Sequence, residues 1–356
     1  MLVAIGTFGV VPQLGSPALR TLASPPYHSA TPIYAGQISF ESQFIKAQTG
    51  FPNPPRSRPL CPRFITMTDQ TSPDPTVSEH AATDQLVTVR HSETTPGLVH
   101  VQLHRPGKLN SLTLDTLNQL VATAHKLRRD RSVRAVILSG FEHNFSAGLD
   151  FASALKNPGR IAATFLPRPW RGTNTFQEAP WAWRRLPVPV IAAVEGYCFG
   201  GGVQIALAAD YRFTTPDAQW SVLEAKWGLI PDMSGIMTMK QVLPIDVMKR
   251  LTMSGEILSG EKAVEYGLAS EVVDDPLAAA EELARQIITR SPDSVAYAKR
   301  VIDETWESGP RMTFLKERLR QARLLAAKNT RIAQKAAAKK IPAEKIAAKF
   351  RRREVR

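Results

Sequence analysis

Hydrophobic and polar residues alternate with a period of two in two segments near residue 90. The segments LVTVRH (86–91) and LVHVQLHR (98–105) show this alternation, which is typical of half-buried β-strands. Two shorter apolar runs, VRAVILSG (133–140) and VPVIAAVEG (188–196), predict buried strands.

Helical periodicity appears between these strands and again after them. The segment LTLDTLNQLVATAHKLRRD (112–130) places leucine and valine at helical spacing and ends in a basic turn that suits the helix dipole. Farther along, LSGEKAVEYGLASEVV (258–273) is typical of an N-cap, a helix, a glycine stop and a strand. Because strands and helices alternate, the pattern predicts an α/β domain with crossover helices.

The chain after Asp275 has a helical pattern almost throughout. Two amphipathic segments, 277–290 and 294–306, are separated by Pro292, which ends a helix or begins a new one. Alanine and lysine dominate the last 35 residues, which contain few large apolar side chains. These residues predict either a solvated helix or a segment without fixed structure, and in neither case a part of the core.

Residues 1–83 are rich in Pro, Ser, Thr and Gly and lack sustained periodicity. Up to Thr68, Glu41 is the only acidic residue, a bias similar to that of a transit peptide, but the opening MLVAIGTFGVV has no basic residue. We expect a disordered or targeting extension, with Met67 as the alternative start of the functional chain. The expected localisation is cytoplasmic, or mitochondrial if residues 1–66 act as a transit peptide.

Composition excludes several classes of protein. Hydrophobic residues make up 43% of the 356 positions and charged residues 22%, which is ordinary for a globular chain. The sequence has no apolar run long enough to span a bilayer, so we expect no membrane segment. Two cysteines, Cys61 and Cys198, cannot form a disulfide framework, and the histidines lack metal-ligand spacing, so we expect no structural metal.

The net charge of +13 is located in the C-terminal region. Residues 311–356 carry 16 Lys and Arg against 3 Asp and Glu, whereas the rest of the chain carries 29 of each sign. Clustered cations attract phosphate backbones, so an RNA-binding protein acting through this basic tail is an alternative of another class. The tail lacks interleaved aromatic residues for base stacking, and we therefore expect nucleic acid to be an unlikely partner.

Three consecutive glycines stand between two apolar runs in GYCFGGGVQIALAAD (196–210). The first amides of a helix have no intrahelical partner, and glycine lets a ligand approach the main chain closely. The amide of Gly201 is therefore a candidate donor to an oxyanion, although glycines before a helix also serve tight packing. Dinucleotide, P-loop and serine-hydrolase motifs are absent, and Cys198, without a histidine partner in view, is better interpreted as a packed thiol.

Four ordered motifs give the chain a family resemblance. They are HRPGKLNSL, VRAVILSGFEHNFSAGLDF, PVPVIAAVEGYCFGGGVQIALAADYRF and WSVLEAKWGLIPD. Over residues 86–290 the chain resembles the crotonase superfamily, the enoyl-CoA hydratase/isomerase family. The resemblance implies a crotonase-like spiral of β-β-α units over 84–275, a helical region over 276–325 that supports homotrimers or hexamers, and a separate basic tail over 326–356.

The resemblance also implies an acyl-CoA site. Two backbone N–H groups, those of Leu149 and Gly201, would hold the thioester oxygen and stabilise an enolate. Ala147, Asp150 and Lys108 would contact coenzyme A, which belongs to the substrate, so no separate cofactor is implied. Relatives have a lysine soon after this turn where the chain has Ala152; Lys156 or a basic residue of the C-terminal helices could replace it.

Three further positions bear on the reaction. Family hydratases hold a water between two glutamates, but the first position here is Gln204, which can orient a water and cannot take its proton. The second, Glu224, is retained, and Asp232 follows where hydratases usually have glycine, which resembles dienoyl-CoA isomerases. Two carboxyl groups facing one pocket suit one base and one acid; the alternative is that both lie on the surface and that the Pro-Asp pair is a simple turn.

These residues favour a double-bond isomerase of unsaturated fatty acyl-CoA. The alternative is an enoyl-CoA hydratase acting mainly through Glu224. The aromatic segment after Phe151 is expected to shape the acyl tunnel, with Trp170, Trp181 and Trp183 as either tunnel or core residues.

Overall fold

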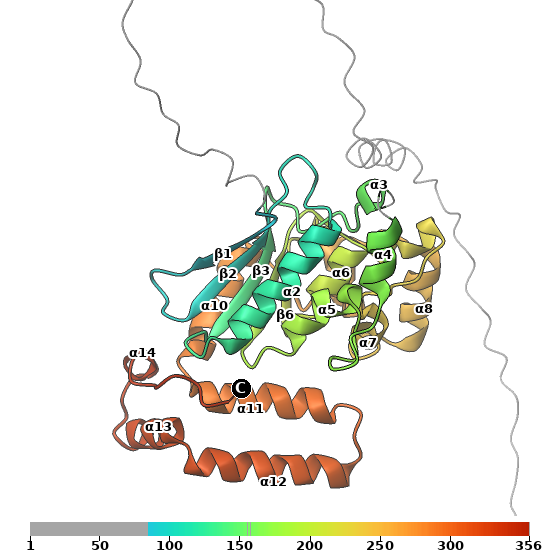
Figure 1. Ribbon diagram of the computed structural model, residues 1–356. Helices are drawn as coiled ribbons and strands as arrows, with labels where there is room; N and C mark the ends of the chain where they lie inside the picture. The colour runs from blue at the N-terminus through green and yellow to red at the C-terminus, as the bar shows by residue number, and fades with distance from the viewer. Residues whose placement is uncertain (1–84, 155, 157, 356) are drawn as a thin grey trace, which may run out of the picture. The chain divides into compact units, whose positions relative to one another are not determined.

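The computed structural model describes residues 85–154, 156 and 158–355 (Figure 1). The extension predicted over residues 1–83 lies outside this range. The strands are β1 (Val87–His91), β2 (Leu98–Leu103), β3 (Ala135–Gly140), β4 (Val190–Val194), β5 (Tyr197–Phe199), β6 (Tyr211–Thr214), β7 (Gln219–Ser221) and β8 (Glu271–Val272). The helices of the body are α2 (Leu114–Arg129), α3 (Phe151–Ala154), α4 (Pro158–Phe165), α5 (Thr175–Arg184), α6 (Gly201–Ala206), the 3₁₀ helix η2 (Leu223–Trp227), α7 (Gly235–Met239), α8 (Ile245–Ser254), α9 (Gly260–Tyr266) and α10 (Pro276–Ile288).

A six-stranded sheet in the order β1-β2-β3-β4-β6-β8 forms the centre of the fold. β1 pairs with β2 in antiparallel register, and the later neighbours are parallel. The strands and helices predicted from periodicity are confirmed in position and type. Parallel neighbours need crossover connections, and the helices between the strands supply them.

A second row of short pairings runs beside the main sheet. β5 pairs with β7, and isolated bridges join Leu112 to Leu149, Ser146 to Cys198 and Trp220 to Leu258. Successive repeats of the fold each add one strand to the main sheet and one short segment to this second row. The chain therefore winds as a spiral. The row matters for function because it brings the turns at 149 and 200 together.

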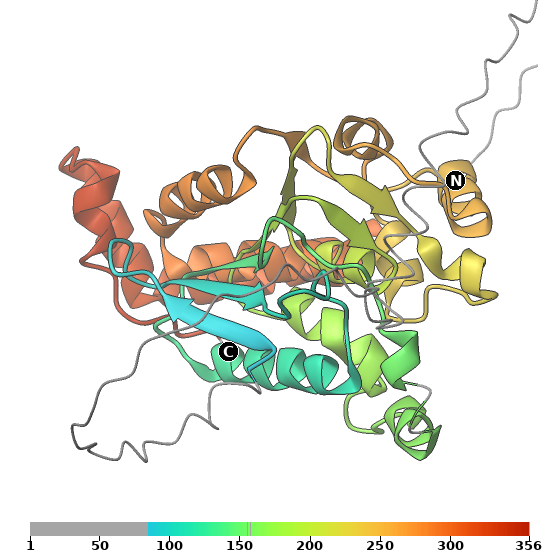
Figure 2. The same ribbon diagram turned by 90° about the horizontal axis from the view of Figure 1, so that it is seen from above.

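Helices cover the sheet on both faces (Figure 2). α2 packs against α5 on one face, and its buried residues join the larger core cluster. Thr113 caps α2 with a reciprocal capping box, and basic residues occupy its last turn, as the helix dipole favours. On the other face Ala280, Ala284 and Ile288 of α10 pack on the strands. The boundary at residue 275 between the crotonase-like core and the helical region stays a prediction.

Four more helices follow the sheet: α11 (Pro292–Thr305), α12 (Pro310–Ala326), α13 (Lys328–Ala338) and α14 (Ala343–Ala347) (Figure 1). Pro292 is the first residue of α11, where its missing N–H costs nothing. Ile302, Trp306, Phe314 and Leu319 expose large apolar side chains on α11, α12 and the turn between them. The role of 276–325 in trimer formation stays a prediction.

The end of the chain forms the largely exposed helices α13 and α14, as the solvated-helix alternative predicted, and in addition it is held against the body. Asp293 accepts hydrogen bonds from the Asn329 side chain (2.7 Å) and from the Glu354 amide (2.6 Å). Asn329 and Arg353 are buried, and the Arg353 Nη2 donates to the carbonyl of Asp130 at 2.7 Å. The sequence did not predict this anchoring, because hydrogen bonds to buried polar groups, rather than large apolar side chains, fix the segment.

We expect Arg353→Met to lower the free energy of unfolding by about 2 kcal/mol, because it leaves buried carbonyls without a donor. The carbonyls of Asp130 and Val355, each 2.7 Å from a guanidinium nitrogen, lose that bond. Urea unfolding measures the change. The exposed neighbour Arg352→Met is the control and should change stability by less than about 0.5 kcal/mol; equal effects of the two variants would contradict the anchoring role.

Within the described residues, the structure contains no helix of the length and apolar character that a bilayer span requires.

Candidate active site

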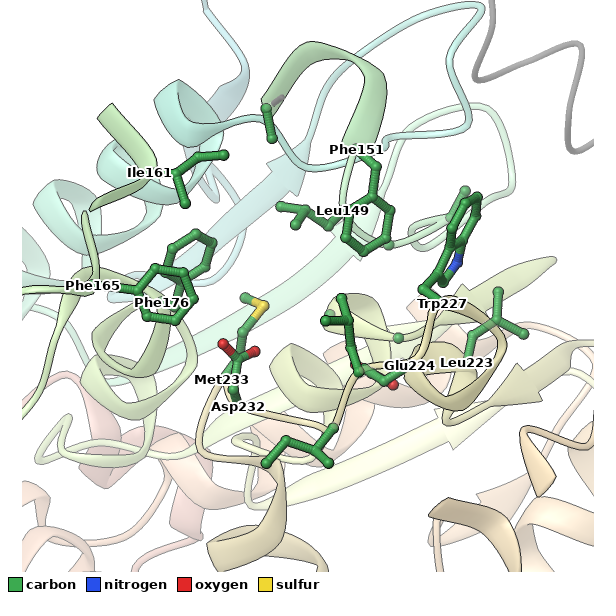
Figure 3. A pocket seen from close by; sticks show the side chains of 17 residues that line it. Leu149, Phe151, Ile161, Phe165, Phe176, Leu223, Glu224, Trp227, Asp232 and Met233 are labelled. Atoms are coloured by element: carbon green, nitrogen blue, oxygen red, sulfur yellow. The ribbon is translucent and has the colours of Figure 1, made fainter. Parts of the chain in front are cut away.

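A cavity of about 700 Å³ opens beside the row of short pairings (Figure 3). It is lined by Ala147, Gly148, Leu149, Phe151, Ala154, Ile161, Phe165, Phe176, Gly200, Gly201, Leu223, Glu224, Trp227, Leu229, Ile230, Asp232 and Met233. Among these described lining residues, only Glu224 and Asp232 can ionise. The cavity is therefore an apolar chamber with two carboxyl groups.

The turn at residues 146–149 forms the first wall of the cavity. Hydrogen bonds within the turn and to residues 110–112 hold it in place. The Ser146 hydroxyl donates to the carbonyl of Asn110 (2.8 Å) and accepts from the amide of Gly148 (3.2 Å). The carbonyl of Gly148 in turn accepts from the amide of Leu112 at 2.8 Å. With its partners on two sides fixed, this turn holds the backbone of Leu149 at the cavity.

The second wall is the turn at residues 199–201, which touches the first turn backbone to backbone. A Cβ on Gly148, which has φ +86°, would stand 2.9 Å from the carbonyl oxygen of Phe199 and 3.7 Å from the amide nitrogen of Gly201. Only glycine allows this approach. Gly201 begins α6, and within the described residues its amide has no hydrogen-bond partner. The backbones of the two predicted oxyanion donors, Leu149 and Gly201, therefore come together at one cavity.

Glu224 stands in η2 and its side chain lines the cavity. Its Oε1 accepts a hydrogen bond from Gln204 Nε2 at 2.6 Å, while its Oε2 is buried and has no partner among the described residues. Gly200 passes so close that a Cβ there would lie 3.4 Å from Oε1. The carboxyl group is thus fixed through one oxygen and leaves the other for chemistry.

Gln204 is only 1% exposed and lies outside the cavity lining. Its Oε1 accepts from the amides of Met233 (2.8 Å) and Gly235 (2.9 Å), and its Nε2 donates to Glu224. A Cβ on Gly235 would collide with the Gln204 amide at 2.5 Å. The side chain therefore joins α6, η2 and the 233–235 turn. These bonds leave one Nε2 hydrogen of Gln204, and the water-orienting role predicted from the sequence would have to use it.

Asp232 lines the same cavity from the segment after η2, and in Figure 3 it lies between Glu224 and the pair Phe165 and Phe176. Burial raises the pKa of Asp232 above its ordinary value. Burial also raises the pKa of Glu224, and the nearby charge of Asp232 adds to this, against hydrogen bonds from the backbone and Gln204. Both carboxyl groups thus hold their protons more strongly than exposed acids do, which suits proton exchange.

The residues predicted to bind coenzyme A have different positions. Ala147 lines the cavity. Asp150 lies outside the lining, where its Oδ2 is 2.8 Å from Arg105 Nη1 and its Oδ1 caps α3 through the amide of Ser153. Lys108 is half-buried in the turn after β2 and also lies outside the lining, while Lys156 is exposed between α3 and α4.

The aromatic segment after Phe151 reaches the cavity through phenylalanines rather than tryptophans. Trp183 is fully buried in the core, Trp181 is half-buried and Trp170 is 78% exposed. Phe165 and Phe176 line the cavity instead, with ring centroids 4.7 Å apart. The sequence analysis did not identify Trp227 and Met233 as cavity residues. Their positions close to Glu224 and Asp232 in the chain were a signal that could have identified them.

Among the described residues, the structure contains no group of three or more His, Cys, Asp or Glu side chains placed to hold a metal ion. Cys198 is a buried free thiol whose pKa is raised by burial, in agreement with a packing role.

Comparison with known proteins gives the family. A family model described as enoyl-CoA hydratase/isomerase matches residues 93–342. Carnitinyl-CoA dehydratase of Salmonella typhi is 32% identical over 213 residues, which cover 59% of this chain and 78% of that protein.

Solved structures agree in fold. An enoyl-CoA hydratase of Bacillus anthracis superposes with a TM-score of 0.65 at 26% identity, covering 72% of this chain and 97% of that one. DspI of Pseudomonas aeruginosa gives 0.64 at 28% identity, covering 74% and 98%. The fold and the enzyme class predicted from the motifs are confirmed. The chain belongs to the enoyl-CoA hydratase/isomerase family, within the crotonase superfamily.

Proposed function

We propose that this enzyme shifts a double bond along an unsaturated acyl-CoA. The observation that carries the proposal is the pair of carboxyl groups, Glu224 and Asp232, on one apolar cavity beside the two amide-bearing turns. The apolar lining suits a fatty acyl chain, because a polar chain would lose its hydrogen bonds to water there.

The proposed reaction uses the main chain to hold the thioester. The amides of Leu149 and Gly201 donate to its carbonyl oxygen, which stabilises the negative charge that develops when C2 loses a proton. Glu224 takes that proton through its unpartnered Oε2, and the electron pair spreads into a dienolate. Asp232, in its protonated form, returns a proton farther along the chain, and exchange with solvent restores both carboxyl groups.

Product analysis with Asp232→Asn tests this assignment. We expect kcat of the variant on a 3,5-dienoyl-CoA to be about a hundredfold lower. General acid–base catalysis by a positioned side chain raises the rate by a factor of about 10²–10⁴. The loss for this variant on a simple 3-enoyl-CoA should be smaller, because Glu224 alone can move a proton between C2 and C4. Mass spectrometry and absorbance of the products measure both reactions. Equal losses on the two substrates would remove the proton-shuttle role of Asp232.

Hydration or dehydration through Glu224 is the second candidate, favoured by the carnitinyl-CoA dehydratase relative. A water cannot be held between carboxylates at positions 204 and 224, because position 204 is a glutamine whose Nε2 contacts Glu224 Oε1 directly at 2.6 Å. A water would instead have to reach Oε2 from the cavity.

We expect Gln204→Glu to raise hydration of a 2-enoyl-CoA by about tenfold or more, since a carboxylate cannot donate to Glu224 and opens a place for water. The new group can still accept from the amides of Met233 and Gly235, so the turn should stay in place. The measurement is 3-hydroxyacyl-CoA formation. An unchanged hydration rate would show that position 204 does not decide between the two reactions.

A further inference from the structure

The last three described segments, α13, α14 and the chain end, carry a set of exposed cations, here called the C-terminal basic segment. Its members are Lys328, Arg331, Lys335, Lys339, Lys340, Lys345, Lys349, Arg351 and Arg352. Within the described part of the chain, no side chain of this set forms a salt bridge or a hydrogen bond. Many cations of the body are paired instead, such as Arg160 with Asp115 and Lys299 with Asp210.

The spacing of these cations along α13 concentrates charge on one side of the helix. Lys328, Arg331, Lys335 and Lys339 follow one another at intervals of three or four residues, and α13 contains no acidic residue. Like charges at such spacing destabilise a helix. A bound polyanion would remove that cost.

Hydrogen bonds to the body of the protein hold the C-terminal basic segment in place. Asn329 at the start of α13 and the amide of Glu354 near the chain end both bond to Asp293. Arg353 anchors the end to the carbonyl of Asp130, directly after the basic last turn of α2. Cations distant in sequence therefore share one region, and binding would cost less ordering entropy than for a free tail.

We propose that the C-terminal basic segment binds the phosphodiester backbone of a nucleic acid without reading its bases. Large apolar side chains are not exposed between residues 328 and 355, so the segment lacks the apolar face that membrane-surface helices insert. Its one aromatic residue, Phe350, is half-buried under Arg134 and offers no stacking platform. The cations of the C-terminal basic segment can therefore recognise only the negative charge of the phosphate groups.

This inference departs from the expectation that nucleic acid is an unlikely partner. That expectation rested on the lack of aromatic residues for base stacking. The sequence could not show that the tail is anchored or that its cations lack protein partners.

The experiment measures binding of labelled DNA duplex, RNA duplex and single-stranded RNA to the full chain by fluorescence anisotropy. We expect binding of both duplexes, with affinity falling about a hundredfold between about 50 and about 200 mM salt if four phosphates are contacted. Lys335→Gln with Lys339→Gln should reduce the slope of log K against log salt by about 1.8.

The control is Lys249→Gln with Lys262→Gln, which removes the same charge from α8 and α9. Equal weakening by the two double variants would overturn the proposal, since net charge would then explain binding. Absence of duplex binding at about 50 mM salt would also overturn it. Tighter binding to vesicles containing phosphatidylserine than to either duplex would assign the segment to membranes instead, and a preference for single strands would contradict backbone-only recognition.

Discussion

We expect Glu224→Gln to lower kcat on a 3-enoyl-CoA by about a thousandfold, in the range that a positioned general base contributes. The amide is nearly the same size as the carboxyl group and can still accept from Gln204 through its oxygen. Affinity for a saturated acyl-CoA should therefore stay within about threefold. Steady-state kinetics and isothermal titration calorimetry measure the two quantities.

The same variant should be more stable than the natural protein. Burial raises the pKa of Glu224 in the folded state, so the folded protein holds this proton more strongly than the unfolded chain does. The group's contribution to stability is therefore present below the unfolded pKa and is lost as pH rises through the folded pKa. We expect the Tm of Glu224→Gln to exceed that of the natural protein by a few degrees near neutral pH, a gap that narrows toward about pH 4.

Glu265→Gln is the matched control, because Glu265 is exposed and, among the described residues, its ion pair is the surface pair with Lys262. It should leave kcat and Tm nearly unchanged. A Glu224→Gln enzyme that keeps more than about a tenth of the natural kcat would show that another group removes the proton.

The raised pKa of Glu224 also predicts how kcat/KM depends on pH in the acidic range. The base must be ionised to accept a proton, and its pKa lies above the ordinary glutamate value. We expect kcat/KM to fall as pH decreases through that raised pKa, so this acid limb of the pH profile lies at higher pH than for an exposed glutamate. In the Gln204→Glu variant the added carboxyl group should move the limb to still higher pH, because neighbouring like charges disfavour ionisation.

The sequence predicted the parts of the site that depend on local pattern. The strand-turn-helix order around Gly201 and the turn at Leu149 follow from periodicity and glycine positions, and Glu224 was identified through the family motif. The direct bond between Gln204 and Glu224 could not be predicted, since it depends on how α6 and η2 approach each other. The choice of Phe176 over Trp183 for the cavity likewise depends on which face of α5 packs on α2.

The tail illustrates a second limit of pattern reasoning. Periodicity detects apolar burial, and residues 328–355 have little of it. Asn329 and Arg353 are buried through hydrogen bonds to partners as distant as Asp293 and Asp130 in the chain. Polar anchors of this kind carry no periodic signal, so their burial appears only when the chain is folded.

Gly148→Ala should lower kcat/KM by about a hundredfold or more, the loss typical of one oxyanion donor. The φ of +86° is unfavourable for alanine, and the added Cβ would stand 2.9 Å from the Phe199 carbonyl oxygen. Because backbone atoms on both sides are fixed, the two turns must separate, and the amides of Leu149 and Gly201 would no longer point at one oxygen. Steady-state kinetics on a 3-enoyl-CoA measures the loss.

The variant Gly172→Ala is the control for Gly148→Ala. It distinguishes the effect of the steric clash at Gly148 from the effect of backbone strain at a positive φ. Gly172 also has a positive φ, +69°, but a Cβ there meets no atom within 4 Å. Both variants bear the cost of an alanine at positive φ, so both should lose similar stability from strain, about 1 kcal/mol or more. Only Gly148→Ala should lose catalysis, because only there does the methyl group push apart the two donors. A Gly148→Ala enzyme with near-natural kcat/KM would show that the thioester oxygen is held elsewhere.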